Sequence, residues 1–362
     1  MAAPRGRGLA APGGRCGPGP GPGVKPRARV RIGTHGGTFH CDEALACFLL
    51  RVLPQYQDAE IVRTRDPQVL EECDVVVDVG GVYDPEKHRY DHHQRSFMET
   101  MASLKSGSRF VTKLSSAGLV YAHFGRRILT QLLQIDCTDP LLDILHDKLY
   151  ENFVEEIDAI DNGISQCDGE PRYNVTTNLS SRVANLNPAW NAKDPDTEEA
   201  FGKAVKLVGS EFLDRLQYYH TSWLPARSLI EEAIQDRFKE DDSGEIVVLG
   251  KGGCPWKEHV FELEKQLQIE TPIKFVLYTD QQGQWRIQCV PQSPNSFQNR
   301  LSLPEEWRGL RDGELSAASG IPGCVFVHAS GFIGGNVSRG GALEMAQAAL
   351  CRGSAPRPPE PS

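Results

Sequence analysis

Between residues 31 and 93, short apolar runs are repeatedly followed by histidine or aspartate, and this pattern limits the folds that the chain can adopt. Val-Arg-Ile precedes His35, and Val75-Val76-Val77 ends at Asp78. Brief β-branched runs bounded by glycine are typical of buried strands. Five of the chain's ten histidines lie in this window, so chemically active side chains are concentrated where the predicted strands end.

Helical segments alternate with these strands. A helix is predicted over 42–53, with two acids in its first turn, where the helix dipole favours them. Further strands are predicted at 60–65 and 74–80, separated by a short helix after Pro67. This alternation predicts the α/β class, with a doubly wound, mainly parallel sheet.

The rest of the chain continues with helices and then changes character. Helical spacing is predicted at 114–133, 140–160 and 198–238, with a break in the last segment at Pro225. From Ser243 onward strands dominate, and the expected elements are strands at 245–249, 274–279, 285–290 and 324–328 and a helix at 341–351. The two middle strands form a hairpin in this prediction. The second half therefore reads as a smaller C-terminal α/β domain.

Composition excludes several classes of protein. The net charge of −9 does not indicate a general binder of polyanions, so any nucleic acid would have to be bound by a local basic patch and by metals. The ten cysteines contain no Cys-x-x-Cys pair and are expected to be reduced thiols in an intracellular compartment. No run of about 18 apolar residues occurs, which predicts no membrane span.

The polar residues at the strand ends predict a metal site. In open α/β sheets, ligands bind at the carboxyl ends of the strands, because side chains from several strands meet there. Imidazole nitrogen combined with hard oxygen suits Mn, Mg, Fe or Zn, and the absence of cysteine pairs argues against a structural zinc centre. The number of candidates favours two metals, the arrangement used to hydrolyse phosphate esters. The candidates are His35, His40, Asp42, Asp78, His92 and His93.

Two residues of this set leave alternatives open. Asp78 is the best bridging candidate, because a carboxylate can give one oxygen to each metal; the alternative is that it caps the following turn. The last ligand is either Asp158 or Asp161, which lie three residues apart on one face of a helix that ends at Asn162-Gly163. Carboxylates at a helix C-terminus oppose the dipole, which favours a functional reason for both. Asp161 is preferred slightly.

Three motifs give the chain a resemblance. They are Gly-Thr-His-Gly-Gly-Thr-Phe-His-Cys-Asp-Glu at 33–43, Tyr-Asp-Pro-Glu-Lys-His-Arg-Tyr-Asp-His-His-Gln at 83–94 and Ile-Asp-Ala-Ile-Asp-Asn-Gly at 157–163. Together they resemble the melanocyte-proliferating-gene exonuclease family, a branch of the DHH phosphoesterase superfamily, over about residues 30 to 350.

The resemblance implies roles for these residues. The metal ligands would be His35, His40, Asp42, Asp78, His92 and Asp161, with Asp158 as the alternative to the last. The implied catalytic groups are Asp78, Asp91, which would orient the imidazoles, and His93, which would face the phosphate. Superfamily phosphatases place the second ligand, an aspartate, four positions after the first histidine, whereas His40 stands one position later.

A substrate-binding region is implied in the C-terminal half. Nucleases of the superfamily carry a Gly-Gly-Gly-His loop, which here stands as Ile333-Gly334-Gly335-Asn336. The amides of Gly334 and Gly335 could hold a phosphate where a helix opens; the alternative is a tight turn before the last helix. A basic patch could include Arg300, Arg308, Arg311 and His328, and the alternative is ordinary solvated charge.

The resemblance also implies a division of the chain and a location. The expected segments are a basic targeting-like segment at 1–28, a DHH-type metal-binding catalytic domain at 29–197, a helical connector at 198–242, a substrate-binding domain at 243–352 and a disordered tail at 353–362. Seven Lys and Arg residues precede the first acid, Asp42, as in mitochondrial targeting segments. The high content of Gly and Pro opposes the usual targeting helix, so a plain basic tail is the alternative. The implied locations are the mitochondrial matrix and the nucleus.

The function expected from these features is hydrolysis of RNA. The chain would be a metal-dependent phosphodiesterase that uses two Mn²⁺ or Mg²⁺ ions and acts as a 3′-to-5′ exonuclease in RNA processing. One alternative is a phosphohydrolase of a small compound such as pyrophosphate or a cyclic dinucleotide. Another is a non-catalytic RNA-binding protein that is stabilised by metal. Dinucleotide binding is disfavoured, because neither Gly-Gly pair completes Gly-x-Gly-x-x-Gly.

Overall fold

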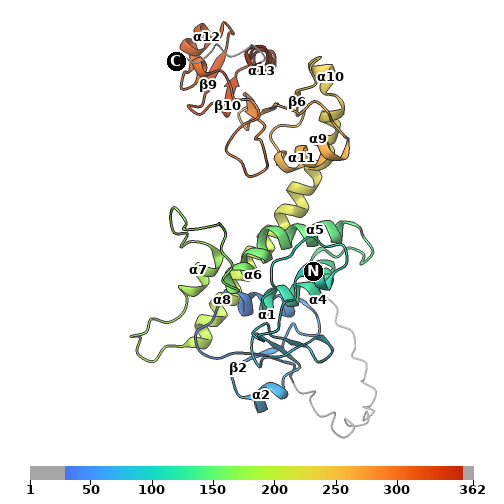
Figure 1. Cartoon of the computed structure of the whole chain (residues 1–362), viewed down its shortest axis with the longest axis vertical. Helices are drawn as coiled ribbons and strands as arrows, with labels where there is room; N and C mark the ends of the chain where they lie inside the picture. Colours follow the sequence, from blue (N-terminus) through green and yellow to red (C-terminus); the bar gives the residue numbers. More distant parts are fainter. Residues whose placement is uncertain (1–28, 354–362) are drawn as a thin grey trace, which may run out of the picture.

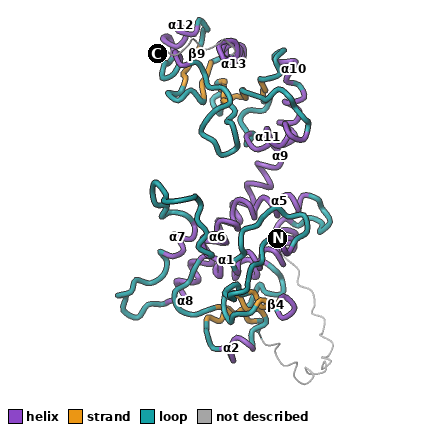
Figure 2. Tube along the Cα trace, viewed as in Figure 1, coloured by secondary structure: helices purple, strands orange, loops and turns teal. Residues whose placement is uncertain are grey.

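The computed structural model describes residues 29–353, which form two lobes joined by a long helix (Figure 1). Each lobe contains a five-stranded sheet with helices around it (Figure 2). We call residues 29–223 the N-terminal lobe and residues 224–353 the C-terminal lobe, because their buried apolar side chains form separate cores. The predicted α/β class is confirmed. The predicted segment 1–28, and the predicted tail apart from Gly353, lie outside the described residues.

The sheet of the N-terminal lobe has the strand order β2-β1-β3-β5-β4. Its strands are β1 (Arg31–Thr34), β2 (Glu60–Arg63), β3 (Val75–Val77), β4 (Tyr83–Asp84) and β5 (Arg89–Tyr90). Three neighbouring pairs are parallel, and only β4 and β5 pair antiparallel. The sequence predicted β1, β2 and β3. It missed β4 and β5, since two-residue strands carry no period that a sequence pattern can reveal.

The two faces of this sheet are covered differently. The helices α1 (Cys41–Val52) and α2 (Pro67–Glu71) were both predicted. Val75 and Val77 point into the large core that contains α1, whereas Val76 packs against Leu70 and Cys73 on the opposite face. Alternate residues of a strand face opposite sides of the sheet, so β3 is buried on both sides and forms its centre.

A layer of helices packs on the face that carries the large core. Its members are α3 (Met101–Leu104), α4 (Ser116–Leu133), α5 (Leu141–Leu149), α6 (Glu155–Asp161) and α7 (Leu179–Ala184). The helix predicted over 140–160 is present, but a π-helical turn, η2 (Tyr150–Val154), joins α5 to α6. Such a turn adds a residue to the helical repeat, so side chains of α6 are rotated relative to the pattern of α5.

The connector is helical throughout and passes from one core to the other. It comprises α8 (Thr197–Tyr218), the π-helical turn η3 (Tyr219–Trp223), α9 (Leu224–Gln235) and α10 (Arg237–Glu240). The break predicted at Pro225 is wrong. Pro225 lies in the first turn of α9, directly after η3, where the helical hydrogen-bonding pattern already changes and a missing amide donor is tolerated. The helix α8 packs in the N-terminal core, and α9 packs in the C-terminal core.

The sheet of the C-terminal lobe has the strand order β6-β7-β8-β10-β9 and is mainly antiparallel, because only β6 and β7 run parallel. Its strands are β6 (Ile246–Val248), β7 (Phe275–Thr279), β8 (Trp285–Cys289), β9 (Cys324–Val327) and β10 (Ile333–Asn336). The hairpin of β7 and β8 was predicted. The remaining helical elements of this lobe are α11 (Lys257–Gln266), the 3₁₀ turn η4 (Glu305–Trp307), α12 (Asp312–Ser319) and α13 (Arg339–Gly353). One further 3₁₀ turn, η1 (Pro85–Lys87), lies between β4 and β5 in the N-terminal lobe.

The Gly-rich segment before the last helix is a strand and not the predicted loop. Gly334 and Gly335 lie within β10, between β8 and β9. A Cβ atom on Gly334 would lie 2.9 Å from Leu303 Cδ1, so the side chain of Leu303 packs directly on the glycine backbone. Asn336 is fully buried, and its Oδ1 accepts a hydrogen bond from the backbone N–H of Ser338, just before α13. Tight packing explains the glycines here.

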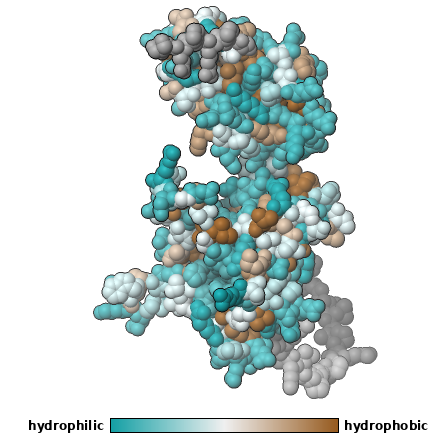
Figure 3. Space-filling view, in the orientation of Figure 1, coloured by the Kyte–Doolittle hydropathy of each residue, from teal (hydrophilic) through white to brown (hydrophobic). Residues whose placement is uncertain are grey.

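The surface is largely hydrophilic, with scattered apolar patches on the N-terminal lobe and a narrow waist between the lobes (Figure 3). Within residues 29–353, no helix has both the length and the apolar character needed to cross a membrane. The nine cysteines in that range are all free thiols.

The contact between α1 and α8 gives a prediction about stability. A Cβ atom on Gly209 would lie 2.3 Å from the ring of Phe48, whereas a Cβ atom on Gly202, in the same helix, would meet nothing within 4 Å. We expect Gly209→Ala to lower the free energy of unfolding by about 1–3 kcal/mol through overpacking. The matched control Gly202→Ala should raise it by up to about 1 kcal/mol, since alanine favours the helix. Urea denaturation measures both, and equal effects would contradict the proposed close contact.

Candidate metal centre

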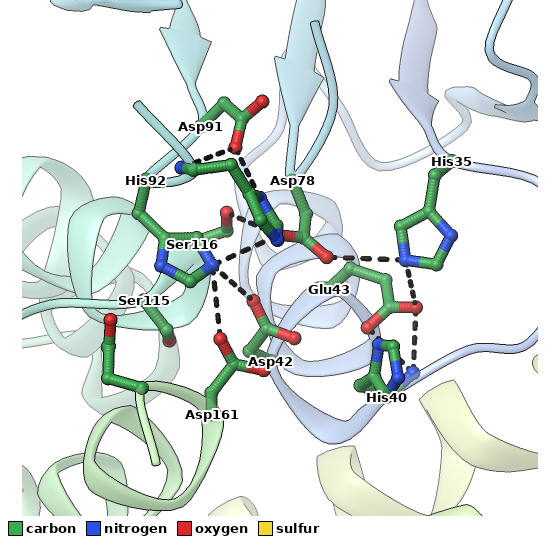
Figure 4. A network of polar contacts seen from close by, with 12 residues as sticks. His35, His40, Asp42, Glu43, Asp78, Asp91, His92, Ser115, Ser116 and Asp161 are labelled. Atoms are coloured by element: carbon green, nitrogen blue, oxygen red, sulfur yellow. Dashed lines mark hydrogen bonds and ion pairs between the residues drawn. The ribbon is translucent and has the colours of Figure 1, made fainter. Parts of the chain in front are cut away.

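Five side chains from distant parts of the N-terminal lobe meet at one edge of its sheet (Figure 4). His35 follows β1, Asp42 lies in the first turn of α1, Asp78 follows β3, His92 follows β5 and Asp161 ends α6. A pocket of about 700 Å³ opens beside them. This is the convergence that the sequence predicted from the carboxyl ends of parallel strands.

Asp78 lies at the middle of the cluster. Its Oδ2 is 3.3 Å from His35 Nε2, and its Oδ1 is 3.3 Å from His92 Nε2. The hydroxyl of Ser116 donates a hydrogen bond of 3.3 Å to Oδ1. The backbone of Asp78 is left-handed, with φ of 57°, which is unusual outside glycine and turns the side chain away from the line of β3. Each oxygen of this carboxylate therefore faces a different imidazole.

One half of the cluster combines His35, His40, Glu43 and Asp78, each of which offers a ligand atom within 4.8 Å of the others. His35 Nδ1 lies 3.3 Å from the carbonyl oxygen of Gly36. A proton on Nδ1 would donate to that carbonyl and leave the lone pair of Nε2 directed at Asp78 and Glu43, which is how a ligating histidine is usually oriented.

Glu43 was missed as a site residue by the sequence analysis. It is fully buried, and its Oε1 is 3.0 Å from His35 Nε2. Both carboxylate oxygens also accept hydrogen bonds from the backbone N–H of His40, at 2.8 and 3.0 Å. This is the capping box of α1, and the spacing His40-x-x-Glu43 could have revealed it. Glu43 thus fixes the start of α1 and faces the cluster at once.

The other half of the cluster combines Asp42, His92 and Asp161. His92 Nε2 is 3.0 Å from Asp161 Oδ2 and 3.9 Å from Asp42 Oδ2. Neither ring nitrogen of His92 has a hydrogen-bond partner of good geometry, and neither oxygen of the fully buried Asp42 has a hydrogen-bond partner. Orphaned buried polar atoms of this kind are costly, and they fit a site that is completed by a cation.

Several acids lie close together in this largely buried cluster, and they shift the pKa values of the groups around them. Burial, followed by repulsion from Asp78 and Asp161, raises the pKa of Asp42 well above its usual value. Although burial alone would lower it, hydrogen bonding to Asp78 and Glu43 raises the pKa of His35 to about 10. In the same way Asp161 and Asp78, acting against burial, raise the pKa of His92 to about 10. The neighbouring carboxylates favour positive charge on the imidazoles, and for the same reason they would favour divalent cations at this place.

The two candidates for the last ligand lie in different surroundings. Asp161 faces His92, as described above. Asp158 is fully buried on the other side and accepts hydrogen bonds from the Ser115 backbone N–H at 3.0 Å, the Gly118 backbone N–H at 3.1 Å and the Tyr150 hydroxyl at 2.9 Å. Asp158 therefore anchors the first turn of α4, which follows Ser115, and is turned away from the cluster.

Asp91 holds only one of the two imidazoles that follow it. Its Oδ1 accepts hydrogen bonds from Nδ1 of His93 at 2.7 Å and from the backbone N–H of His93 at 3.1 Å, and its Oδ2 accepts from the Gly81 backbone N–H at 2.6 Å. The side chain of His93 is 60% exposed and borders the pocket. His92 receives no such bond, so the orienting role expected for Asp91 applies to His93.

The structure does not bring the predicted substrate-binding residues to this pocket. All of them lie in the C-terminal lobe, and the pocket is lined by residues of the N-terminal lobe. Arg300 is held by Glu264 at 2.6 and 2.7 Å, Arg308 donates to the carbonyl oxygen of Leu303, and Arg311 lies 5.9 Å from the ring of Phe326. His328 interacts with Ser330. Arg65, Ser180 and Ser181 border the pocket instead, and no pattern in the sequence marks them.

Comparison with known proteins places the chain in a family. A family model for MYG1 exonuclease, described as "Uncharacterised protein family (UPF0160)", matches residues 31–350. The chain belongs to the MYG1 exonuclease family. No solved structure matches it.

Relatives in this family cover nearly the whole chain. The chain is 65% identical to the MYG1 exonuclease of Mus musculus over 332 residues, covering 91% of this chain and 87% of the relative. It is 65% identical to the MYG1 exonuclease of Homo sapiens over 331 residues, covering 91% and 88%. The MYG1 protein of Dictyostelium discoideum is 50% identical over 321 residues, covering 88% and 95%. The resemblance to the melanocyte-proliferating-gene exonuclease family, which is the MYG1 family, is thereby confirmed.

The orphaned carboxylate gives a prediction that separates function from stability. In EDTA at pH 7, Asp42→Asn should raise the free energy of unfolding by about 1–3 kcal/mol, because burial and the neighbouring acids oppose ionisation of this carboxyl group in the folded state. The same change should weaken Mn²⁺ binding at least about tenfold. Urea denaturation and isothermal titration calorimetry measure the two effects. The exposed control Asp214→Asn should change neither, and a destabilised Asp42→Asn protein would argue against charge repulsion at the site.

Asp158 should behave in the opposite way. Asp158→Ala leaves two backbone N–H groups and the hydroxyls of Ser115 and Tyr150 without this buried acceptor, so we expect a loss of about 2–4 kcal/mol in the free energy of unfolding. Mn²⁺ binding to the folded protein should persist. If Asp158→Ala abolished metal binding while Asp161→Ala did not, the assignment of these two aspartates would have to be exchanged.

Proposed function

We propose that this protein is a metal-dependent phosphodiesterase of the DHH type, a 3′-to-5′ exonuclease that acts in RNA processing in the mitochondrial matrix and the nucleus. The observation that carries the proposal is that Asp78 belongs to two ligand sets, one with His35, His40 and Glu43 and the other with His92 and His93, and that His92 in turn joins Asp42 and Asp161. Such a pair suits two hard divalent cations, for which we propose Mn²⁺ or Mg²⁺. The MYG1 exonuclease relatives support the reaction by their names.

The residues divide the work of hydrolysis between them. Divalent cations bound here would supply Lewis-acid activation of water and neutralisation of phosphate charge. Asp78 is placed to hold both halves of the site together, with one oxygen towards each. Asp91 fixes Nδ1 of His93, and this hydrogen bond raises the pKa of the imidazole, which favours a charged donor at the pocket. The other ring nitrogen of His93 is then free to donate a hydrogen bond to the substrate phosphate.

Cys41, the thiol that borders the pocket within residues 29–353, is not suited to act as a covalent nucleophile. Burial raises the pKa of Cys41 to about 12, so the thiol stays protonated and is a poor nucleophile. Water is therefore the proposed nucleophile, as in other sites built from paired metal ligands.

A small phosphate compound is the second candidate for the substrate. It is favoured by one observation, that Arg300 is already paired with Glu264 and that none of the predicted basic residues borders the pocket. Competition separates the candidates: pyrophosphate or a cyclic dinucleotide that suppresses RNA digestion at low concentration, and is itself consumed faster, would replace RNA as the substrate.

Digestion of end-labelled RNA with Mn²⁺ tests the proposal. A 5′-labelled oligonucleotide should give a descending ladder, and a 3′-labelled one should release a labelled mononucleotide at once. Asp78→Asn should lower the rate at least about a hundredfold, because it removes the carboxylate shared by both halves. Asp214→Asn is the matched control and should keep full activity. RNA that stays intact, or an Asp78→Asn protein as active as the wild type, would refute the proposed reaction.

A further inference from the structure

A second cavity, of about 670 Å³, lies at the waist of the molecule and is not part of the metal centre. One wall is the end of α8 with η3, and the other is the loop that leads from β6 into α11, together with β7. The side chains that give it its character are aromatic or cationic: Arg215, Tyr218, Tyr219, Trp256, Lys257 and Tyr278. The cavity therefore combines contributions from both lobes.

Aromatic side chains of the cavity are stacked on one another, and Tyr218 is the most exposed of them. Tyr218 is 39% exposed. Behind it, Tyr219 is buried and meets Tyr218 edge-to-face with ring centroids 5.3 Å apart, and Trp223 meets Tyr219 in the same way at 5.8 Å. Across the cavity, the hydroxyl of Tyr278 donates to Gln288 Oε1 at 2.7 Å. Edge-to-face stacks of this kind fix the orientation of the accessible ring before anything binds.

The charge at the cavity is positive. Within residues 29–353, no acid forms an ion pair with Arg215 or Lys257, and the Arg215 guanidinium lies 5.9 Å from the ring centroid of Tyr218. The acid at this place, Glu258, is already engaged. Its Oε2 is 2.9 Å from Lys148 Nζ and accepts a 2.7 Å hydrogen bond from Trp223 Nε1. Two cations beside an accessible ring are thus left for a ligand.

We propose that this cavity binds an unpaired base of single-stranded RNA, stacked on Tyr218, with the neighbouring phosphates held by Arg215 and Lys257. Proteins that hold single strands combine aromatic rings with cationic side chains in this way, because every base has a face that can stack. The inference rests on the proposed function, since it takes RNA as the substrate, and it assigns a site for the strand at some distance from the reacting phosphate.

The connector sets that distance. The helix α8 begins close to the loop that follows His35, because Arg63 donates a hydrogen bond to the Gly37 carbonyl and lies 3.2 Å from Glu198, and it ends at Tyr218 (Figure 1). Its 22 residues span about 33 Å. An RNA strand that reaches both sites must therefore be several nucleotides long. The cavity binds the body of a longer RNA, and a dinucleotide at the metal centre cannot reach it.

Variants of Tyr218 test the inference by binding and by hydrolysis. Binding of a fluorescent 15-nucleotide oligouridylate is measured in EDTA, and hydrolysis of the same RNA and of a diuridylate is measured with Mn²⁺. Tyr218→Ala should weaken binding of the long RNA about tenfold and raise its KM similarly, and should leave hydrolysis of the dinucleotide unchanged. Tyr218→Phe keeps the ring and should behave as the wild type. Lys206→Ala, a cation on an exposed part of the same helix, is the matched control.

The outcomes separate this inference from the proposed function. If the wild type binds and digests the long RNA and Tyr218→Ala does both equally well, the cavity is not a site for the strand, while the metal centre keeps its proposed role. If Tyr218→Ala impairs the dinucleotide as much as the long RNA, the residue acts on the metal centre or on folding, which also overturns the inference. If the wild type neither binds nor digests RNA, the proposed function itself fails.

Discussion

The N-terminal lobe holds three buried acids and one half-buried acid close together, and their mutual repulsion is what its fold has to withstand. Asp42, Glu43, Asp78 and Asp161 converge within a few ångströms of His35 and His92. Charges of one sign in a buried place oppose folding unless a cation compensates them. The scaffold that holds them must therefore be stable for other reasons, and the site becomes a strong attractor for divalent cations because the acids cannot move apart.

Particular residues at the ends of strands and helices hold the acids of the site in place. Asp78 keeps a left-handed backbone directly after a strand that is buried on both faces. Glu43 closes the capping box of α1 and so fixes the turn that carries Asp42. Asp158 and Asp161 lie three residues apart in α6. Asp158 accepts hydrogen bonds from the start of α4, and Asp161 faces His92. Asp42 and Asp161 thus each have a nearby acid in the same helix that stabilises the fold.

The sequence predicted those parts of the fold and site that rest on strong local patterns. The strands before His35 and Asp78, the helix that begins near Asp42 and the meeting of these residues all followed from β-branched runs, glycine and the rule for parallel sheets. It could not reveal β10, because glycines in a strand look like a loop until Leu303 is seen packed against them. It also could not place Arg300 beside Glu264, and it preferred Asp161 to Asp158 only slightly, since tertiary contacts decide the first point and the hydrogen bonds of Asp158 to Ser115 and Gly118 decide the second.

An anomalous difference map, recorded at the manganese absorption edge from crystals grown with Mn²⁺, would test whether these side chains form a metal centre. We predict two peaks in each molecule, one on either side of the Asp78 carboxylate. The first should lie near His35 and His40 and the second near Asp42, His92 and Asp161. A map without peaks at this carboxylate, or with manganese bound only elsewhere, would contradict the claim that these acids and imidazoles form a metal centre.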